Sequence, residues 1–246
     1  LSLAADYGIP VIEDCAQAHG ALYKGRMAGT LGNISTFSTM SGKHHATGPQ
    51  GGVVFTHNED LCWEAKRFSD RGKPFNSNTD SNMRAGLNLN GNDLSAAIGR
   101  VQLLKIGDMI DKRRQLASSI EASIADLKAI RLGSRLPKTE GVYWFVRFHI
   151  EVEKLTVDKE VFAAAVAAEG IPVTASYRQI PSHFKWFKER QVFPGSDYPW
   201  GLPAYKGDRD AQFPCRNAIA AVESHFIMFI HENWGPQEVD DVAAAL

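Results

Sequence analysis

The first part of the chain constrains the fold most, because short apolar segments alternate there with turns and helices. Three segments, at residues 9–14, 34–38 and 52–56, are short and apolar enough to be buried strands. Ser2–Tyr7 is typical of the end of a helix, and Gly8 of its stop. This alternation predicts an α/β layer fold.

Turn and cap residues mark where these elements begin and end. Lys24 and Gly25 predict the turn of a small hairpin within residues 21–29. Thr56 and Glu59 have the spacing of a capping box, so we expect a helix to follow and to end near residue 69.

A long connection from Arg71 to Asn92 is rich in Gly, Asn and Ser and has little apolar periodicity. Connections of this length are usually either functional or mobile. Asn92 is a suitable N-cap for a helix from Asp93 to about Ile106, and a further helix should run to about Lys128. The first of these helices carries one apolar face, formed by Leu94, Ala97, Ile98, Val101 and Leu104.

The second part of the chain is typical of a smaller α+β domain. Gly133–Gly141 has the composition of a linker, and the alternation in Val142–Ile150 predicts a strand whose aromatic residues fill the core, namely Trp144, Phe145 and Phe148. Further strands are expected at residues 171–175 and 226–230, and a helix at 158–169. Pro236 fits the first position of a last helix.

Composition excludes several classes of function. The 246 residues contain 27 Lys and Arg against 28 Asp and Glu, which gives no electrostatic reason to expect nucleic acid or an anionic membrane. No apolar run approaches the roughly 20 residues that span a bilayer. The odd number of widely spaced cysteines predicts neither a disulfide framework nor a zinc site, and therefore a cytoplasmic protein. His225 and His231 lack a further ligand at metal-binding spacing, so we expect no metal.

The beginning of the sequence shapes another expectation. Leu1 is not preceded by Met, and the chain opens in what should be the last turns of a helix. We therefore expect a fragment that lacks earlier strands and helices and is inactive by itself.

The first predicted strand ends in two acids, in the run from Val11 to Gly20. A carboxylate at the carboxyl end of a buried strand lies where open α/β sheets bind ligands. Asp14 could hold a cofactor's pyridine nitrogen protonated, and Gln17 could donate to its 3-hydroxyl oxygen. An equally simple interpretation is a strand-end acid that caps the next turn.

A lysine follows the second predicted strand. Phe37 and Ser38 lead into hydroxyl residues and then Lys43, and a turn-rich run reaches Gly51-Gly52 before the next strand. Pyridoxal phosphate (PLP) needs hydroxyls and backbone N–H groups for its phosphate and a lysine amine for its aldehyde. Taken alone, a lysine after a strand is usually only a solvated charge.

The order of these motifs resembles the DegT/DnrJ/StrS family of sugar and cyclitol aminotransferases, which are PLP enzymes of fold type I. The resemblance is strong to about Arg114 and looser beyond it, at Ile171-Pro172 and the helix that starts at Pro236. The matching residues are Glu13-Asp14, Ala16, Ala18, Gly20, Tyr23-Lys24-Gly25, Gly29, Phe37-Ser38, Lys43, Gly51-Gly52, Gly86-Leu87-Asn88, Ala96-Ala97-Ile98-Gly99 and Gln102-Leu103.

The resemblance implies a fold and a division into domains. Residues 1–130 would be the C-terminal part of a three-layer PLP-binding large domain, with a dimer loop at 71–92. Residues 131–246 would form the small C-terminal α+β domain. The family builds its active sites across a homodimer, so a second copy of the chain is the implied partner.

The resemblance also implies the role of each site residue. Lys43 would form the Schiff base with PLP, Asp14 would pair with the pyridine nitrogen, and Gln17 would lie against the 3-hydroxyl. Ser38 would contact the phosphate, and Asn88 would reach the phosphate in the neighbouring subunit's site. The implied reaction converts a nucleotide-linked keto-sugar or a keto-cyclitol to the amine, with glutamate or glutamine as amino donor.

Three positions depart from the family pattern, and they bear on the substrate more than on the cofactor. Asn90 stands where the family usually has Arg, His44-His45 where it has Asn, and Gln50 where it has an acid. Further candidates for substrate contact are His44, Arg178 and His231, each with a structural or surface role as the alternative.

Two other functions stay open at this point. A PLP-dependent sugar dehydratase of the same fold would have histidine in place of the Schiff-base lysine; Lys43 argues against it, although His44 is adjacent. A non-catalytic homologue should have lost at least one residue of the set Asp14, Gln17, Ser38 and Lys43, and none is lost.

Overall fold

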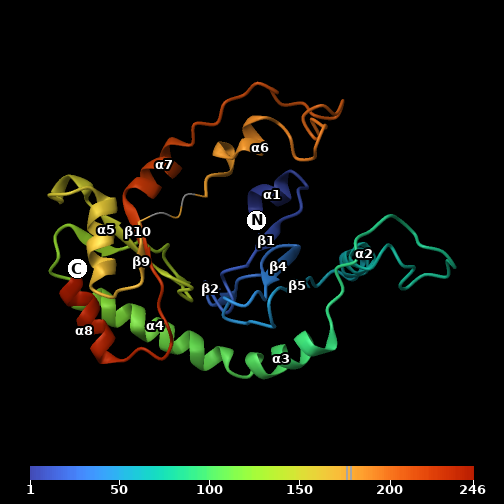
Figure 1. Cartoon of the computed structure of the whole chain (residues 1–246). Helices are drawn as coiled ribbons and strands as arrows, with labels where there is room; N and C mark the ends of the chain where they lie inside the picture. The colour runs from blue at the N-terminus through green and yellow to red at the C-terminus, as the bar shows by residue number, and fades with distance from the viewer. Residues whose placement is uncertain (176, 178) are drawn as a thin grey trace. The chain divides into compact units, whose positions relative to one another are not determined.

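The computed structural model describes residues 1–175, 177 and 179–246 (Figure 1). The chain forms two compact units, each built from several segments. The first unit contains Leu1–Ala122, Ser134–Trp144 and Ile230–Val239, and the second contains Ser123–Gly133, Phe145–Phe229 and Asp240–Leu246. The division that we expect at residues 130–131 stays a prediction.

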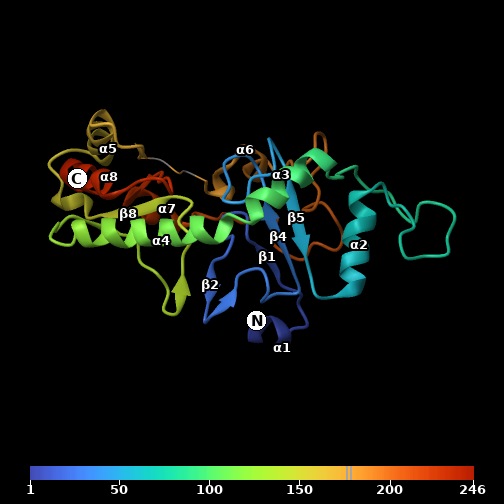
Figure 2. The same ribbon diagram turned by 90° about the horizontal axis from the view of Figure 1, so that it is seen from below.

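A three-stranded sheet organises the first unit. Its strands β1 (Ile12–Asp14), β4 (Ile34–Ser38) and β5 (Gly52–Phe55) lie in the order β1-β4-β5 and run side by side in both views (Figures 1 and 2). β1 is parallel to β4, with Asp14 opposite Thr36, whereas β5 is antiparallel to β4. The carboxyl ends of β1 and β4 therefore meet at one edge.

A second small sheet begins with the expected hairpin. β2 (Leu22–Tyr23) and β3 (Arg26–Met27) are joined by Lys24 and Gly25, whose φ angles of 52° and 73° make the left-handed turn that a two-residue hairpin requires. β7 (Thr139–Glu140) pairs with the other edge of β2. The interpretation of Gly133–Gly141 as a plain linker is therefore wrong, because part of it satisfies the backbone groups along that edge.

The helix after β5 starts at a different cap from the one expected. In α2 (Glu59–Ser69) the N-cap is Asn58, whose side chain accepts a hydrogen bond from Leu61 N at 2.9 Å. The Thr56–Glu59 capping box is wrong, because the Thr56 hydroxyl donates to Asn33 O at 2.6 Å instead. Thr56 thus belongs to the end of the sheet.

Three other helices belong mainly to the first unit. α1 (Ser2–Asp6) opens the chain. α3 (Asp93–Leu103) confirms the predicted cap, since Asn92 accepts from Ser95 N at 2.9 Å. α4 (Ile106–Ser123) ends earlier than predicted and buries Ile110, Leu116, Ala117 and Ile120.

The connection from residue 71 to 92 folds back onto the end of α2. Leu87 N donates to Phe68 O at 2.9 Å, and Leu89 N donates to Ser69 O at 2.8 Å. A side chain at Gly72, where φ is +75°, would place its Cβ 1.7 Å from Arg84 O. Backbone hydrogen bonds and one obligatory glycine therefore shape a segment that has no apolar pattern.

The second unit contains a four-stranded antiparallel sheet in its described residues. Its order is β6-β8-β10-β9, with β6 at Ile130–Leu132, β8 at Val146–Ile150, β10 at His225–Met228 and β9 at Val173–Thr174. Phe148 and Phe226 are fully buried and stack with their ring centroids 4.9 Å apart. This stacked pair marks the core of the unit.

Short helices flank this sheet in the sequence. They are η1 (Val152–Lys154), α5 (Lys159–Ala168), η2 (Pro181–His183), α6 (Lys185–Lys188) and α7 (Arg216–Glu223). The last helix, α8 (Pro236–Ala245), begins at proline as predicted. Among the described residues, no helix has the length and apolarity needed to cross a membrane.

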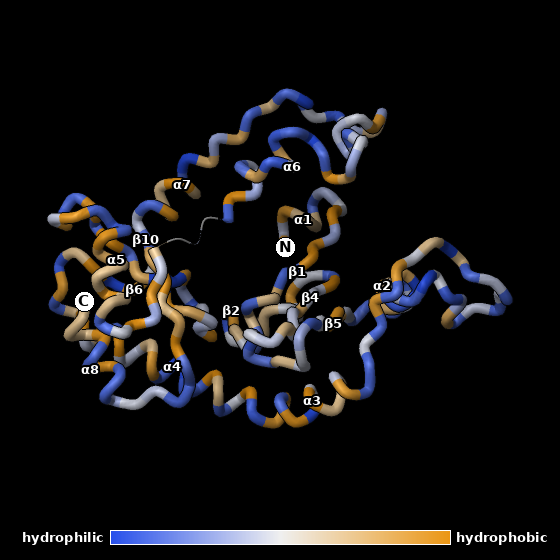
Figure 3. Tube along the Cα trace, in the orientation of Figure 1, coloured by the Kyte–Doolittle hydropathy of each residue, from blue (hydrophilic) through white to orange (hydrophobic). Residues whose placement is uncertain are grey.

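Much apolar surface of the first unit is exposed in this chain. Ile12 is 69% exposed, Leu94 is 74% exposed and Leu104 is 87% exposed. Along α3, apolar and polar residues alternate (Figure 3). Exposed apolar area of this kind is an association liability when nothing covers it.

We therefore expect the 246 residues, expressed by themselves, to self-associate. Covering even a few hundred Å² of apolar surface is worth several kcal/mol at about 25 cal/mol per Å². Light scattering after gel filtration should show oligomers or aggregates, together with binding of a hydrophobic dye. A monodisperse monomer without dye binding would contradict this expectation.

Candidate active site

Two consecutive acids at the end of β1 have different surroundings. The Glu13 side chain accepts backbone N–H bonds from Gly29 at 2.8 Å, Leu31 at 2.7 Å and Gly32 at 2.6 Å. The next residue, Asp14, is exposed at the edge of the sheet. Successive side chains of a strand point to opposite faces, so one acid anchors a turn while the other faces solvent.

The charge of Glu13 is held by this turn. Burial by itself would raise the pKa of Glu13, but the three backbone N–H bonds and the nearby Arg26 outweigh it, so the pKa lies below its usual value. This role of Glu13 is not among the predictions from the sequence. The signal was present in the turn between β3 and β4, where several backbone N–H groups need an acceptor.

Asp14 makes the local capping contact that was one of the two interpretations of this acid, and its role toward a cofactor stays a prediction. Its Oδ1 accepts a hydrogen bond from Ala16 N at 3.0 Å, which is the local capping interaction. Its charge also acts on Lys43, where it favours the protonated amine. Gln17, three residues further, is half-buried. Parallel pairing of β1 with β4 thus brings Asp14 and Lys43 to the same edge of the sheet.

The segment that carries Lys43 is a closed loop after β4. Thr39 N donates to Gly51 O, and Thr47 N donates to Thr39 O, each at 2.9 Å. The hydroxyls of these two threonines are 2.7 Å apart. A Cβ on Gly51 would lie 2.4 Å from Thr39 Oγ1, so glycine is required where the loop closes. Lys43 N donates to Met40 O at 2.9 Å inside this loop.

The Lys43 amine is half-buried against an aromatic ring. Its Nζ lies 3.8 Å from the ring centroid of Trp144. Burial lowers the pKa of Lys43 below its usual value, although the charge of Asp14 opposes the shift. The expectation that Trp144 fills the core is wrong. Trp144 lies two residues before β8, where the alternation of that strand does not yet apply.

Three histidines gather around this loop. The His44 ring is buried and shares a hydrogen bond of 2.9 Å with Val142 O, and the His45 ring shares one of 3.0 Å with Gly99 O. The centroid of the buried His19 ring lies 6.1 Å from His44 and 6.3 Å from His45. The hydrogen bonds of His44 and His45 connect the lysine loop to residues more than fifty positions away in the chain.

Burial keeps two of these rings neutral. It lowers the pKa of His19 to about 4, helped by the charges of His45 and Lys43. Among the described residues, neither ring nitrogen of His19 has a partner in hydrogen-bonding geometry, although the nearby Ser38 backbone favours the charged form. Burial also lowers the pKa of His44 to about 4, with the Arg113 charge as the second cause. Both are therefore uncharged near neutral pH.

A half-buried ion pair supports the segment before β8 that carries Trp144. Arg113 Nη2 lies 2.7 Å from Glu232 Oε2, and Arg113 Nη1 donates to Tyr143 O at 3.0 Å. Arg113 comes from α4, whereas Glu232 lies more than a hundred residues later. Sequence reasoning had no local signal for this pair.

The remaining predicted site residues have modest contacts in the structure. Ser38 Oγ accepts from Met40 N at 3.4 Å, and His231 Nδ1 accepts from Asn233 N at 3.1 Å. The exposed Asn88 side chain accepts a hydrogen bond of 2.9 Å from Asn90 Nδ2. Arg178 lies outside the described residues. The proposed roles of these residues stay predictions.

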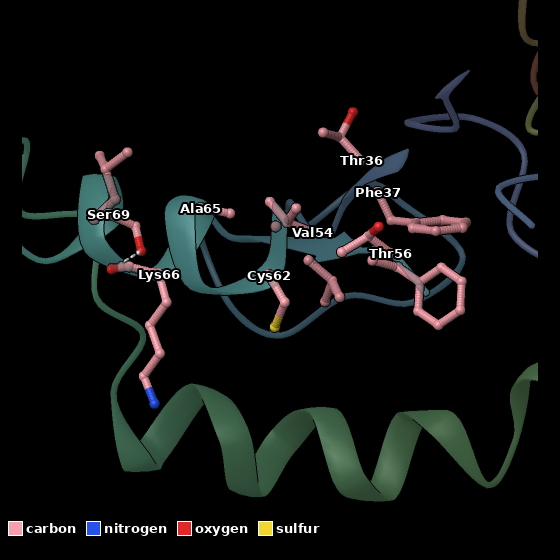
Figure 4. A pocket seen from close by; sticks show the side chains of 12 residues that line it. Thr36, Phe37, Val54, Thr56, Cys62, Ala65, Lys66 and Ser69 are labelled. Atoms are coloured by element: carbon pink, nitrogen blue, oxygen red, sulfur yellow. Dashed lines mark hydrogen bonds between the residues drawn. The ribbon is translucent and has the colours of Figure 1, made fainter. Parts of the chain in front are cut away.

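A separate hollow of about 640 Å³ lies between β5 and α2. Figure 4 shows Phe37 and Val54 of the sheet on one side of it and Cys62, Ala65 and Lys66 of the helix on the other. Neither Asp14 nor Lys43 lines it. In the described part of the chain, no group of three or more His, Cys, Asp or Glu residues could hold a metal ion.

Comparison with known proteins identifies the family. The whole chain, residues 1–246, matches the DegT/DnrJ/EryC1/StrS aminotransferase family. The chain belongs to this family. The resemblance inferred from the motifs is thereby confirmed.

Relatives of known name support the assignment. The chain is 34% identical to GDP-perosamine synthase of Escherichia coli O157:H7 over 208 residues, which are 83% of this chain and 56% of that protein. It is 30% identical to 3-amino-5-hydroxybenzoate synthase of Amycolatopsis mediterranei over 187 residues, which are 72% of this chain and 46% of that protein. The chain thus spans about half the length of these relatives.

Solved structures show the fold. An aminotransferase from Psychrobacter cryohalolentis superimposes with a TM-score of 0.80 at 22% identity, over 99% of this chain and 62% of that one. A 3-amino-5-hydroxybenzoic acid synthase superimposes with a TM-score of 0.77 at 24% identity, over 99% of this chain and 61% of that one. The predicted fold, α/β of PLP-transferase fold type I, is confirmed.

The turn held by Glu13 leads to an expectation for acid stability. Because the folded-state pKa lies below the usual 4.5, the stabilisation is complete above about pH 4.5 and is lost as pH falls through the folded-state pKa. Glu13→Gln should lower the free energy of unfolding by about 1.5–3 kcal/mol at pH 7, the range for hydrogen bonds to a charged group. The difference from the parent should shrink below pH 4.

Urea unfolding of the full-length gene product at pH 7 and pH 3.5 would measure this. Glu59→Gln is a matched control, since Glu59 lies exposed in the first turn of α2. An equal loss at both pH values would contradict a charge-based role for Glu13.

Proposed function

We propose that the protein is a PLP-dependent aminotransferase that converts a keto-sugar or a keto-cyclitol to the corresponding amine. The single observation that carries this proposal is the Lys43 amine, half-buried in a closed loop at the sheet edge where Asp14 also lies. Glutamate or glutamine would be the amino donor. The protein would act in the cytoplasm, as its cysteine usage suggests.

The residues at this edge fit PLP. The aldehyde needs an amine that can lose its proton, and burial lowers the pKa of Lys43 in that direction. The pyridine nitrogen needs a carboxylate, and the exposed Asp14 carboxylate already acts electrostatically on Lys43. The phosphate needs hydroxyls and backbone N–H groups, and Ser38 lies at the end of β4 on the same edge.

The bound cofactor would supply an electron-accepting ring for a substrate carbanion. Asp14 would hold the proton on the pyridine nitrogen. Lys43 would hold the cofactor's aldehyde carbon through Nζ, and the same amine is placed to carry a proton between substrate atoms. Gln17 would donate to the 3-hydroxyl oxygen. These roles need the lysine to be partly buried, as it is in the loop that the Thr39 and Thr47 hydroxyls close.

A homodimer would complete the site. In this proposal Asn88 reaches the phosphate of the neighbouring subunit, and Asn90 holds the Asn88 side chain in place. The exposed apolar residues of α3, including Leu94 and Val101, are consistent with such an interface. His44, Arg178 and His231 remain proposed substrate contacts, although the His44 ring is buried and bonded to Val142 O.

The names of the relatives guide the proposed substrate class. They include a GDP-perosamine synthase, a dTDP-3-amino-3,4,6-trideoxy-alpha-D-glucose transaminase and a 3-amino-5-hydroxybenzoate synthase. These names cover amino sugars and an aminated ring, so both nucleotide-linked keto-sugars and keto-cyclitols belong in a first screen.

Lys43 should be the residue that carries the cofactor. Borohydride reduction of the PLP-loaded full-length protein, followed by peptide mapping, should place the pyridoxyl group on Lys43. Lys43→Ala should abolish turnover, because it removes both the covalent anchor and the proton carrier. A label on Lys24 or Lys73 instead would refute the assignment.

Asp14 should matter more for catalysis than for cofactor retention. A charge-assisted hydrogen bond to the pyridinium is worth roughly 1.5–3 kcal/mol, so Asp14→Asn should bind PLP more weakly but still bind it. The half-reaction with glutamate should lose most of its rate, because the ring is no longer held protonated. Stopped-flow absorbance would measure it, with Asp6→Asn in α1 as the control. A near-normal rate in Asp14→Asn would exclude this role.

A further inference from the structure

Trp144 contacts the lysine loop in two independent ways. Its indole N–H donates to Gly42 O at 2.6 Å, and its ring lies 3.8 Å below Lys43 Nζ. All three residues belong to the first compact unit. One side chain, about a hundred positions away in the sequence, therefore fixes both the backbone before Lys43 and the position of its amine.

We propose that Trp144 is a positioning residue that gives the Lys43 amine a defined resting place whenever the amine is not joined to a carbonyl. The ring face attracts the ammonium form of the amine. The hydrogen bond from the indole N–H to Gly42 O holds the backbone of the turn in place. The inference deepens the proposed function, on which its catalytic part rests. The contact between amine and ring does not depend on that function.

The groups around Lys43 offer its amine few other partners. Asp14 is the acid whose charge acts on Lys43, and the nearby His19 ring is buried and uncharged near neutral pH. His45 is held by Gly99 O. Burial favours a neutral amine, whereas Asp14 and the Trp144 ring favour a charged one. Because leucine keeps apolar cover over the amine but has no ring face, Trp144→Leu should shift this balance toward the neutral form.

The reactivity of Lys43 toward acetic anhydride tests the resting place without any turnover. The full-length gene product, freed of cofactor, would be acetylated at a series of pH values and Lys43 quantified by peptide mass spectrometry. Lys105, exposed in the same protein, is the internal reference. Trp144→Leu should move the midpoint of the Lys43 profile about 0.5–1 pH unit lower, and Trp144→Phe, which keeps a ring, less far.

A midpoint that stays unchanged or rises in Trp144→Leu would overturn the proposal. A second measurement uses the unaltered Trp144, in case the variants do not fold. With 5-fluorotryptophan incorporated, one of the five fluorine resonances should titrate at the Lys43 midpoint, and this should vanish in Lys43→Met. No resonance that titrates with Lys43 would equally overturn it.

The catalytic part has its own readout. Once borohydride labelling has placed the cofactor on Lys43, Trp144→Leu should slow the glutamate half-reaction about 3- to 10-fold and leave the half-saturating glutamate concentration nearly unchanged. Trp144→Phe should recover part of the rate. A change confined to the half-saturating concentration would refute this part, whereas labelling at another lysine would refute the proposed function and leave the amine–ring contact standing.

Discussion

Parallel pairing of β1 with β4 is the constraint on which the candidate site depends. The register places Asp14 opposite Thr36, so the acid that ends one strand and the loop that follows the other emerge at the same edge. Side chains cannot create this proximity, because the carboxyl ends of two strands meet only if the strands run in the same direction. Glu13 reinforces the pairing, since its carboxylate holds the turn that returns the chain to β4.

Local signals predicted the parts of the fold that local chemistry decides. The bounds of β4, the Lys24-Gly25 hairpin and the Asn92 cap all follow from residues within a few positions of each other. The Thr56–Glu59 cap failed for the opposite reason. The Thr56 hydroxyl has a partner, Asn33 O, across the sheet, and no short window of sequence contains both residues.

The candidate site likewise has residues that local sequence predicts and residues that it does not. Asp14 and Lys43 could be named from the sequence because one ends a recognisable strand and the other follows one, whereas the residues that support them could not. Trp144 reaches the loop from the end of a distant segment, and Arg113 holds that segment through Tyr143 O and Glu232. The alternating aromatic pattern predicts that Trp144 is a core residue. The pairing of β8 begins only at Val146, so Trp144 lies outside this strand.

The state of the Lys43 amine follows from three influences of different origin. Burial favours the neutral form of the amine. Asp14 and the Trp144 ring both favour the ammonium form. The two attractions differ in the distance over which they act and in whether they depend on where the amine lies. The Asp14 charge acts through space without fixing where the amine lies, whereas the ring attracts it only along its face. In the proposed function the lysine alternates between bound and released states, and it would need both influences because its proton affinity and its position must be set separately.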